Sequence, residues 1–333
     1  MILITGGTGL AGSHLVLQLL RKGEKLKILI RSESSKSIFE NLIKILAEEN
    51  ENHLKTVEYS FGDILDKASL EEAFVGVTHV YHCAAMVSFN RSDRKKMLDT
   101  NIRGTANVVN CCLEHGVKKL VHVSSVAAVK SSAENKKIVE DNGWPTGKNL
   151  DYAYSKTESE FEVWRGISEG LNAVIVNPSV ILGFGDPKKS STKLFGRVKQ
   201  GMKFFTRGIT GFVDAEDVAR AMVMLMESDV QAERYIVNAE NLSYEELFAK
   251  MAGALKVKPP KHYAGRFLTE IAWRAEFFLS LILFKKPILT KGTARTSHVK
   301  QYYSSDKLTN AFNFKFTSID NTIKRVASLM ELA

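Results

Sequence analysis

Cysteine and proline are scarce in this sequence of 333 residues, and neither forms a pattern. The three cysteines, with Cys111 and Cys112 adjacent, argue against a disulfide framework and a cysteine-based zinc site. The six prolines form no linker, and no repeat or low-complexity tract divides the chain. The cysteine pattern leads us to expect a cytoplasmic protein without a bound metal. Because the first strand is expected at residues 1–5, we expect no cleavable signal peptide.

Long hydrophobic runs and clustered charge are also missing. The most apolar stretch is 262–289, but its longest charge-free run, Phe277 to Phe284, is too short for a transmembrane helix of about 20 residues. We expect an amphipathic helix packed on the substrate domain; the alternative is an apolar flap on a membrane surface, with Lys285 and Lys286 at the headgroups. The net charge of +9 comes from scattered residues, so we expect an anionic cofactor and no nucleic acid.

Apolar runs alternate with helical patterns over residues 1–176. This alternation predicts βαβ units, and therefore an α/β fold with a doubly wound parallel sheet. After Pro178 the pattern becomes mostly helical. We expect a dinucleotide-binding domain at 1–176, rejoined by 212–238, and a smaller, mainly substrate-binding domain over 177–333.

Three glycines separate the first expected strand from the first expected helix, in TGGTGLAG at 5–12. Gly6, Gly9 and Gly12 have the spacing of a dinucleotide-binding turn, where glycine permits a tight bend and close approach of a pyrophosphate. The amides that open the following helix would face the phosphates. The alternative is a glycine-rich turn without a ligand, but the strand–turn–helix context favours the cofactor.

Two residues after the next strands bear on which cofactor binds. Arg31 ends the strand LKILI, where an NAD site would carry Asp or Glu, and a guanidinium there can bind the 2′-phosphate of NADP. Lys36 would add a second positive charge. The alternatives are that Arg31 is a solvated surface residue and that the cofactor is NAD. Asp63 follows the strand VEYSF and is interpreted as a partner of the adenine amino group, with Asp66 as the N-cap of the next helix.

The segment YAYSK suggests a proton-transfer pair. Tyr152 and Lys156 lie four residues apart in a helix expected over 151–169, so they share one face. The ammonium is expected to lower the tyrosine pKa from about 10, so that Tyr152 exchanges a proton with a substrate oxygen. Ser125 ends a buried strand, beside the ligand crevice of a doubly wound sheet, where it would bind that oxygen; the alternative is a turn residue.

Together these motifs resemble the extended short-chain dehydrogenases/reductases of the epimerase/dehydratase superfamily. The resemblance spans nearly the whole chain and includes HCAA at 82–85, NIRGTANVV at 101–109 and NPSVILG at 177–183. It implies Ser125, Tyr152 and Lys156 as the catalytic residues. The cofactor-binding residues predicted by the motifs and the resemblance are Gly6, Thr8, Gly9, Leu10, Gly12, Arg31, Lys36, Asp63, Ile64, Ala84, Ala85, Asn101, Lys156, Pro178 and Ser179. Asn101 is also expected to hold a proton-relay water.

Further residues narrow the resemblance to one branch. Val126 and Ala127 replace the acidic pair usual in sugar-nucleotide dehydratases, and Val174 replaces an arginine usual in epimerases. The Glu140 to Trp144 spacing is similar to that of dihydroflavonol reductases and 3β-hydroxysteroid dehydrogenases. That branch implies NADP-dependent hydride transfer to or from a small substrate, often a lipophilic one.

Two other functions stay open: a sugar-nucleotide epimerase with tightly bound NAD, and a non-catalytic cofactor sensor that binds a protein partner. The family often forms homodimers through paired helices, for which the expected helices at 92–115 and 151–169 are the candidates.

Overall fold

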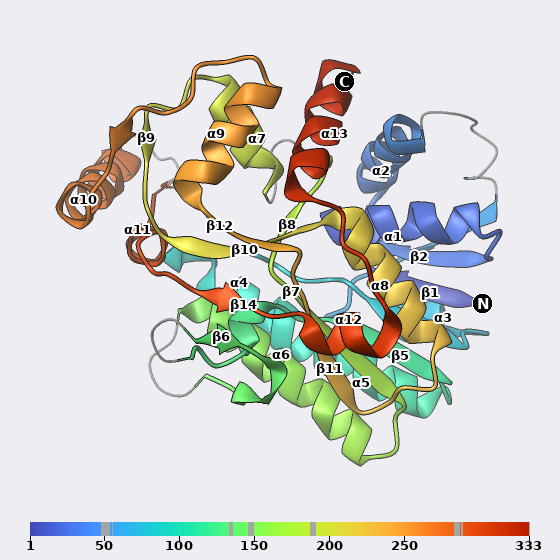
Figure 1. The fold of residues 1–333 in the computed structure, drawn as a ribbon. Helices are drawn as coiled ribbons and strands as arrows, with labels where there is room; N and C mark the ends of the chain where they lie inside the picture. Colours follow the sequence, from blue (N-terminus) through green and yellow to red (C-terminus); the bar gives the residue numbers. More distant parts are fainter. Residues whose placement is uncertain are drawn as a thin grey trace.

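The computed structural model describes residues 1–47, 54, 56–132, 136–145, 150–186, 191–282, 287 and 289–332. At its centre is a parallel sheet of seven strands in the order β11-β7-β5-β4-β1-β2-β3 (Figure 1). These strands are β1 (Ile2–Thr5), β2 (Leu26–Ile30), β3 (Val57–Phe61), β4 (His79–His82), β5 (Lys119–Val123), β7 (Ala173–Pro178) and β11 (Glu233–Val237). The expected doubly wound parallel sheet is confirmed.

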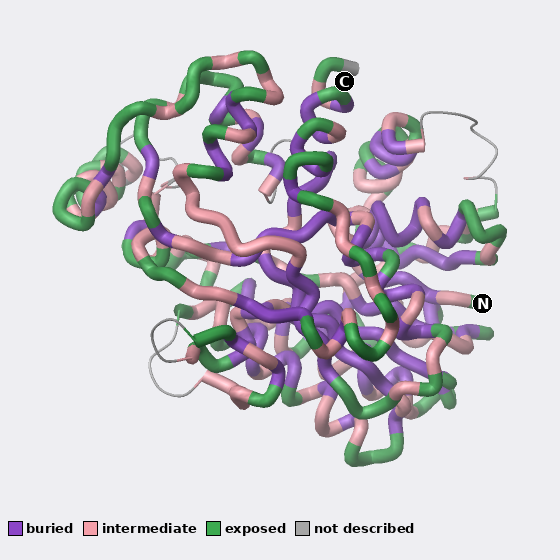
Figure 2. Tube along the Cα trace, in the orientation of Figure 1, coloured by how far each residue is buried: buried purple, intermediate pink, exposed green. Residues whose placement is uncertain are grey.

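Helices cover both faces of this sheet (Figure 1). One face is covered by α1 (Leu10–Arg21), α2 (Glu33–Ala47) and α8 (Ala215–Glu227), and the other by α3 (Lys67–Phe74), α5 (Gly104–Glu114) and α6 (Asp151–Ser168). The central strands are apolar on both sides because each side meets a helix layer, and Figure 2 shows them as the buried centre of the molecule. Two cores result, one on each face.

The strand order reverses between β1 and β4, since β2 and β3 lie on one side and β5, β7 and β11 on the other. In such sheets the ligand crevice lies beyond the carboxyl ends of the strands at this switch point. Short helical segments follow β4 and β5 at this edge. They are η2 (Arg91–Asp93), α4 (Arg94–Leu98), the π-helical turn η3 (Asp99–Arg103) and η4 (Val126–Ala128).

A second group of elements has its own core around Phe195, Phe212 and Leu247. Its three-stranded sheet has the order β12-β10-β8.

The elements of the chain not yet named are β6 (Lys137–Ile138), η5 (Glu140–Asn142), β8 (Val180–Leu182), α7 (Thr192–Lys199), β9 (Phe204–Phe205), β10 (Ile209–Asp214), β12 (Glu240–Ser243), α9 (Tyr244–Ala254), β13 (His262–Tyr263), α10 (Arg266–Ile282), α11 (Lys291–Thr296), β14 (Tyr302–Tyr303), α12 (Asp306–Phe312) and α13 (Ile319–Leu332).

The segment 212–238 contributes to both sheets. Strand β10 lies in the small sheet, whereas β11 pairs with β7 at the edge of the large one. The division of the chain at residue 176 stays a prediction.

Helix α10 corrects one expectation. It was predicted to bury an apolar face, yet Thr269 is its only buried side chain among those described at 266–280. Within the described part of the chain, no helix combines the length and apolarity that a membrane span requires. Lys285 and Lys286 lie outside the described residues.

Candidate active site

The glycine turn after β1 leaves no room for side chains at two positions. Gly6 has a φ of +72°, a left-handed conformation that glycine adopts without strain, and a Cβ there would lie 2.4 Å from the Ala84 amide nitrogen. A Cβ at Gly12 would lie 2.2 Å from the Gly6 carbonyl oxygen. These two glycines therefore let β1, α1 and the end of β4 approach one another closely.

The middle glycine and the start of α1 fit a dinucleotide. Gly9 is exposed, and a Cβ there would meet only the Gly6 carbonyl oxygen, at 3.2 Å. Gly9 is also the N-cap of α1, and no side chain caps this helix end. The first amides of α1, flanked by Thr8 and Leu10, therefore offer hydrogen bonds and the positive end of the helix dipole to a pyrophosphate.

The residues expected to select the cofactor lie at the carboxyl end of β2. Arg31 directly follows this strand and is exposed. Lys36 lies in the first turns of α2, with its ammonium 4.8 Å from the centre of the Tyr59 ring. Both cations therefore lie near the carboxyl end of β2, as expected. Their role in cofactor choice stays a prediction.

Asp63, after β3, forms a hydrogen bond within its own loop. Its Oδ1 accepts a hydrogen bond from the Leu65 amide at 2.9 Å, which leaves its other oxygen as the acceptor for an adenine amino group. Asp66 occupies the N-cap of α3 as expected, but its side chain makes no capping hydrogen bond.

The loop after β3 also contacts the NIRGTANVV segment. Gly104 is needed here because a Cβ would lie 2.4 Å from Cδ1 of Ile64. Asn107 Nδ2 donates to the Ile64 carbonyl at 2.8 Å. The Gly and the second Asn of this motif thus hold α5 against the expected adenine site.

Asn101 connects the chain after β4 to α6. Its Oδ1 accepts from the Met86 amide at 2.7 Å, and its Nδ2 donates to the Met86 carbonyl at 3.0 Å and to Ser155 Oγ at 2.9 Å. This buried amide therefore fixes the segment after β4 that contains Ala84 and Ala85. Its expected relay-water role stays a prediction.

Ser125, Tyr152 and Lys156 come together at the carboxyl end of β5. Ser125 is the N-cap of η4, where its Oγ accepts from the Ala127 amide at 3.1 Å. The Ser125 side chain lies next to Tyr152 and favours its ionised form. One turn further along α6, Lys156 Nζ donates to the Val123 carbonyl at 2.8 Å. The helical spacing and the strand end thus produce the cluster predicted from the motifs.

The pKa of Tyr152 differs from the expectation. Burial raises it, and the neighbouring Ser125 side chain opposes this effect only in part. The predicted lowering by Lys156 is therefore wrong for this arrangement, in which the lysine points at a backbone carbonyl. Burial also lowers the pKa of Lys156 to about 8, against the attraction of Glu160 and Cys83 for its charged form.

The remaining predicted cofactor residues, Pro178 and Ser179, lie at the end of β7. Pro178 is the last residue of the strand, and the Ser179 amide donates to the Val237 carbonyl of β11 at 3.1 Å. The predicted residues at strand ends therefore lie along the same carboxyl edge of the large sheet, from β3 across to β7.

A buried carboxylate beneath this cluster was missed from the sequence. Glu160, fully buried, accepts hydrogen bonds from Ser124 Oγ at 2.7 Å and from Asn177 Nδ2 at 2.9 Å. Asn177 Nδ2 also donates to the Ser125 carbonyl at 3.0 Å. A signal was present, because Glu160 is four residues after Lys156 and so continues the Tyr152–Lys156 face of α6.

The other oxygen of Glu160 binds groups from distant parts of the chain. Arg234 Nη1 forms an ion pair with it at 2.9 Å, and Trp144 Nε1 donates to it at 3.1 Å. The Arg234 guanidinium also lies 4.7 Å from the centre of the Trp144 ring, while Glu140 Oε1 accepts from the Ile236 amide at 2.7 Å. The Glu140 to Trp144 spacing therefore has a structural cause: this segment closes over the buried ion pair.

Replacing Glu160 by Gln is expected to lower the free energy of unfolding by about 3–5 kcal/mol, because Arg234 keeps a buried charge without its counterion. Urea denaturation at pH 7 measures this change. The matched control is Glu162→Gln, two residues further along α6, whose partly exposed pair with Arg165 contributes about 0–1 kcal/mol. Equal losses in the two variants would contradict the assignment.

Known proteins similar to this chain cover most of its length. Residues 2–239 match the NAD dependent epimerase/dehydratase family. Sterol demethylase protein B of Methylococcus capsulatus is 31% identical over 83% of each chain, and a putative dihydroflavonol 4-reductase of Synechocystis is 26% identical over 96% of this chain and 91% of its own. The crystal structure of gox2253 has a TM-score of 0.81 and 26% identity, covering 100% of this chain and 98% of its own.

The fold, the glycine turn and these matches agree with one another. The family match covers well over half of the chain and includes the glycine turn, Ser125 after β5, Pro178 and Ser179 at the end of β7, and α6. The chain therefore belongs to the NAD-dependent epimerase/dehydratase family, the extended short-chain dehydrogenases/reductases, and is an NAD(P)-dependent oxidoreductase.

Proposed function

We propose that this enzyme uses NADP to transfer hydride to or from a carbonyl or secondary alcohol carbon of a small, lipophilic substrate by a Ser–Tyr–Lys mechanism. The observation that carries this proposal is the placement of Ser125 beside Tyr152 at the end of β5, with Lys156 one turn away on α6. The names of the sterol and flavonoid relatives support a lipophilic substrate.

The bound cofactor supplies hydride chemistry, and the protein supplies position and proton management. The turn at Gly6, Gly9 and Gly12 and the amides of α1 hold the pyrophosphate. Ser125 donates a hydrogen bond to the substrate oxygen and fixes it beside Tyr152. Asp63 and Ile64 line the adenine side, and Pro178 and Ser179 line the other end of the cofactor.

Tyr152 is the proton donor in the reducing direction. Because burial raises its pKa above the ordinary value of about 10, the hydroxyl is protonated at neutral pH and gives its proton to the developing alkoxide. Lys156, also protonated at neutral pH, stabilises the resulting phenolate and binds the ribose. These protonation states favour carbonyl reduction at neutral pH.

Arg31→Asp is expected to weaken NADPH binding by about 10- to 100-fold, because a charge-assisted hydrogen bond is lost and a carboxylate then faces the 2′-phosphate. Titration calorimetry with NADPH and NADH measures both affinities. NADH has no 2′-phosphate, so its affinity should stay the same or rise.

Lys25→Asp is the matched control, since Lys25 is exposed and precedes the opposite end of the same strand. It should leave both affinities unchanged. A wild-type preference for NADH, or dinucleotide that copurifies with the protein, would contradict the NADP assignment and favour an epimerase with tightly bound NAD.

A further inference from the structure

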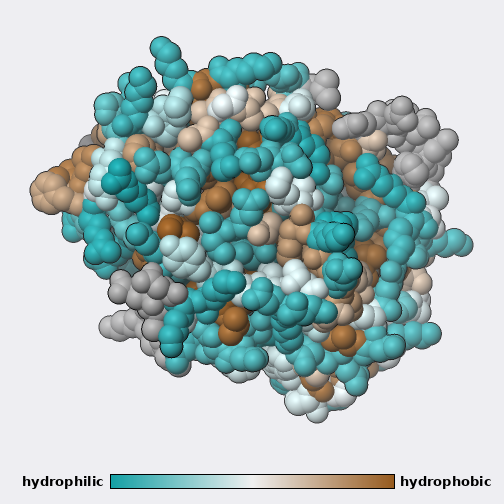
Figure 3. Space-filling view, viewed as in Figure 1, coloured by the Kyte–Doolittle hydropathy of each residue, from teal (hydrophilic) through white to brown (hydrophobic). Residues whose placement is uncertain are grey.

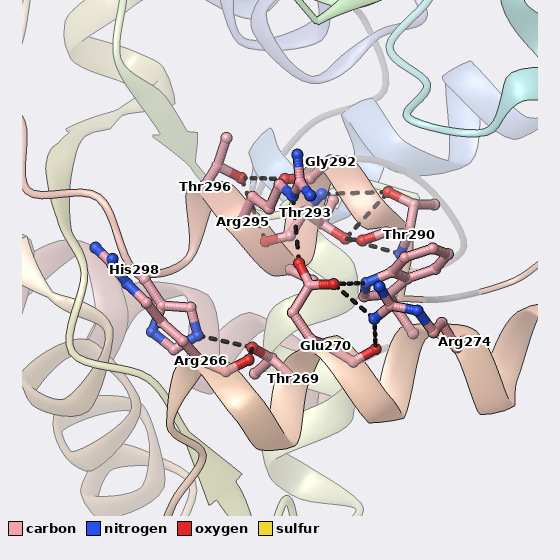
Figure 4. A network of polar contacts seen from close by, with 12 residues as sticks. Arg266, Thr269, Glu270, Arg274, Thr290, Gly292, Thr293, Arg295, Thr296 and His298 are labelled. Carbon is pink, nitrogen blue, oxygen red and sulfur yellow. Dashed lines mark hydrogen bonds and ion pairs between the residues drawn. The ribbon is translucent and has the colours of Figure 1, made fainter.

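Helix α10 is attached to the protein by its polar side. Glu270 accepts hydrogen bonds from Trp273 Nε1 at 3.0 Å and Arg274 Nη1 at 2.6 Å, both on α10, and from Arg295 Nε of α11 at 3.2 Å. Figure 4 shows this carboxylate pointing from α10 toward α11. Glu270 therefore attaches one side of α10 to α11.

Two further contacts belong to the same polar attachment. The buried Thr269 hydroxyl is hydrogen-bonded to His298 Nε2 at 2.8 Å, beside Arg266 in Figure 4. On α11, which carries Arg295 in its last turn, the capping box of Thr290 and Thr293 fixes the beginning of the helix. These contacts hold α10 in one orientation, so its outward face is determined by the fold.

The outward face of α10 is apolar. Phe267 is 81% exposed and Phe278 is 63% exposed, and these two lie on the same side as Ile271 because they are spaced by four and seven residues. Figure 1 shows α10 projecting at the edge of the molecule, and Figure 3 shows apolar atoms gathered there. We call this surface the α10 face. Its exposed apolar residues are Phe204, Tyr263, Phe267, Leu268, Ile271, Phe277, Phe278 and Leu279.

Exposed cations border the α10 face. Lys203 and Arg207 flank β9, Lys258 and Lys261 precede β13, and Arg266 begins α10; all five are exposed. Over the described residues 256–282 the chain carries five Lys or Arg and two acidic residues, so this region shares the positive sign of the whole chain. Basic residues around an apolar helical face are the arrangement that binds anionic lipid surfaces.

We infer that the α10 face binds the surface of an anionic membrane, with α10 lying along the interface and its bordering cations at the lipid headgroups. The attachment leaves Phe267, Ile271 and Phe278 outward for the lipid. Arg274, three residues after Ile271 and four before Phe278, lies among them and is paired with Glu270. The charges argue against a second copy of this chain as the occupant, because a two-fold contact would place like-charged borders together. The inference does not depend on the proposed substrate or reaction.

The test is sedimentation of the full chain with vesicles, one set of phosphatidylcholine and one of phosphatidylcholine and phosphatidylglycerol in equal parts. The protein is expected to bind the anionic vesicles more tightly, and added salt should reduce this difference. Phe267→Ser combined with Phe278→Ser should lower the partition coefficient by more than about tenfold. Removing Lys261 and Arg266 as Gln variants should lower it by about fivefold for each cation.

The matched control is Ile38→Ser combined with Val75→Ser, because these exposed apolar residues lie on α2 and after α3, away from the α10 face. This variant should bind as the wild type does, and thermal melts should show all variants folded. Absence of vesicle binding by the wild type, or equal binding by the Phe variant, would overturn the inference. A wild-type dimer that the Phe variant abolishes would instead show that a second copy covers this face, and would also overturn it.

Discussion

Tyr152→Phe is expected to lower kcat by about 10²- to 10⁴-fold, the usual contribution of a positioned acid or base. Phenylalanine keeps the ring, including its contact with Phe89 at 5.7 Å between ring centroids, but removes the proton that the substrate oxygen needs. Dinucleotide affinity should stay within about twofold of the wild type, because the nucleotide contacts assigned to this protein are made by other residues. Rates are measured with NADPH and whichever carbonyl compound the wild type reduces.

The neighbouring Tyr154 provides the control for this experiment. It lies on the same helix but is 43% exposed, so Tyr154→Phe should leave kcat nearly unchanged. Full activity in Tyr152→Phe would show that another group supplies the proton and would contradict the Ser–Tyr–Lys mechanism. A wild type that binds dinucleotide but turns over no carbonyl compound would favour the cofactor-sensing alternative.

Acidification is expected to unfold this protein steeply, because three buried histidines stay neutral in the folded state. Burial lowers the pKa of His14 to about 4 and that of His82 to about 3, and it holds the pKa of His122 well below its ordinary value of 6.5. Below pH 6.5 the unfolded chain binds these protons and the folded chain does not. The stabilisation is therefore complete above pH 6.5 and is lost as the pH falls toward the folded values.

The expected slope is about 1.4 kcal/mol per pH unit for each histidine, or about 4 kcal/mol per pH unit for the three together. Burial also raises the pKa of Glu140 and Glu216, and these carboxyls oppose part of the effect near their own titration. Because a folded domain has about 5–15 kcal/mol of stability, we expect acid unfolding about one to four pH units below 6.5. Urea denaturation at a series of pH values measures the slope.

His122→Phe removes one of these three titrating side chains and so tests its share of the slope. Neither ring nitrogen of His122 has a hydrogen-bond partner among the described residues, so phenylalanine removes no bond and keeps the ring next to His82, whose centroid lies 5.0 Å away. The slope should fall by about one third, with stability at pH 7 unchanged or higher. Parallel curves for the variant and the wild type would contradict this account.

His82 shows why the histidines are structural. Its Nδ1 is hydrogen-bonded to Thr5 Oγ1 at 2.7 Å and its Nε2 to Thr105 Oγ1 at 2.9 Å, so both nitrogens are used between β1 and α5. Only the structure gave its two partners, since they come from residues 77 and 23 positions away in the chain.

The sequence alone determined the parts of this protein that depend on local spacing. The alternation of apolar runs predicts the parallel sheet, the glycines at positions 6, 9 and 12 predict the turn, and the four-residue interval of Tyr152 and Lys156 predicts a shared helical face. Each of these patterns is set by backbone geometry within a few residues. The motifs that follow strands lie along one edge of the sheet because the strands are parallel.

The tertiary structure decided what depends on burial and on contacts between distant segments. The pKa of Tyr152 is raised because burial outweighs the effect of Ser125. Glu160 meets Arg234, 74 positions away in the chain, because β11 lies beside β7. Helix α10 has the composition of a buried amphipathic helix, but its attachment through Glu270 to α11 turns the apolar side outward. Periodicity predicts that a helix has two faces, and only its neighbours in the fold determine which face is covered.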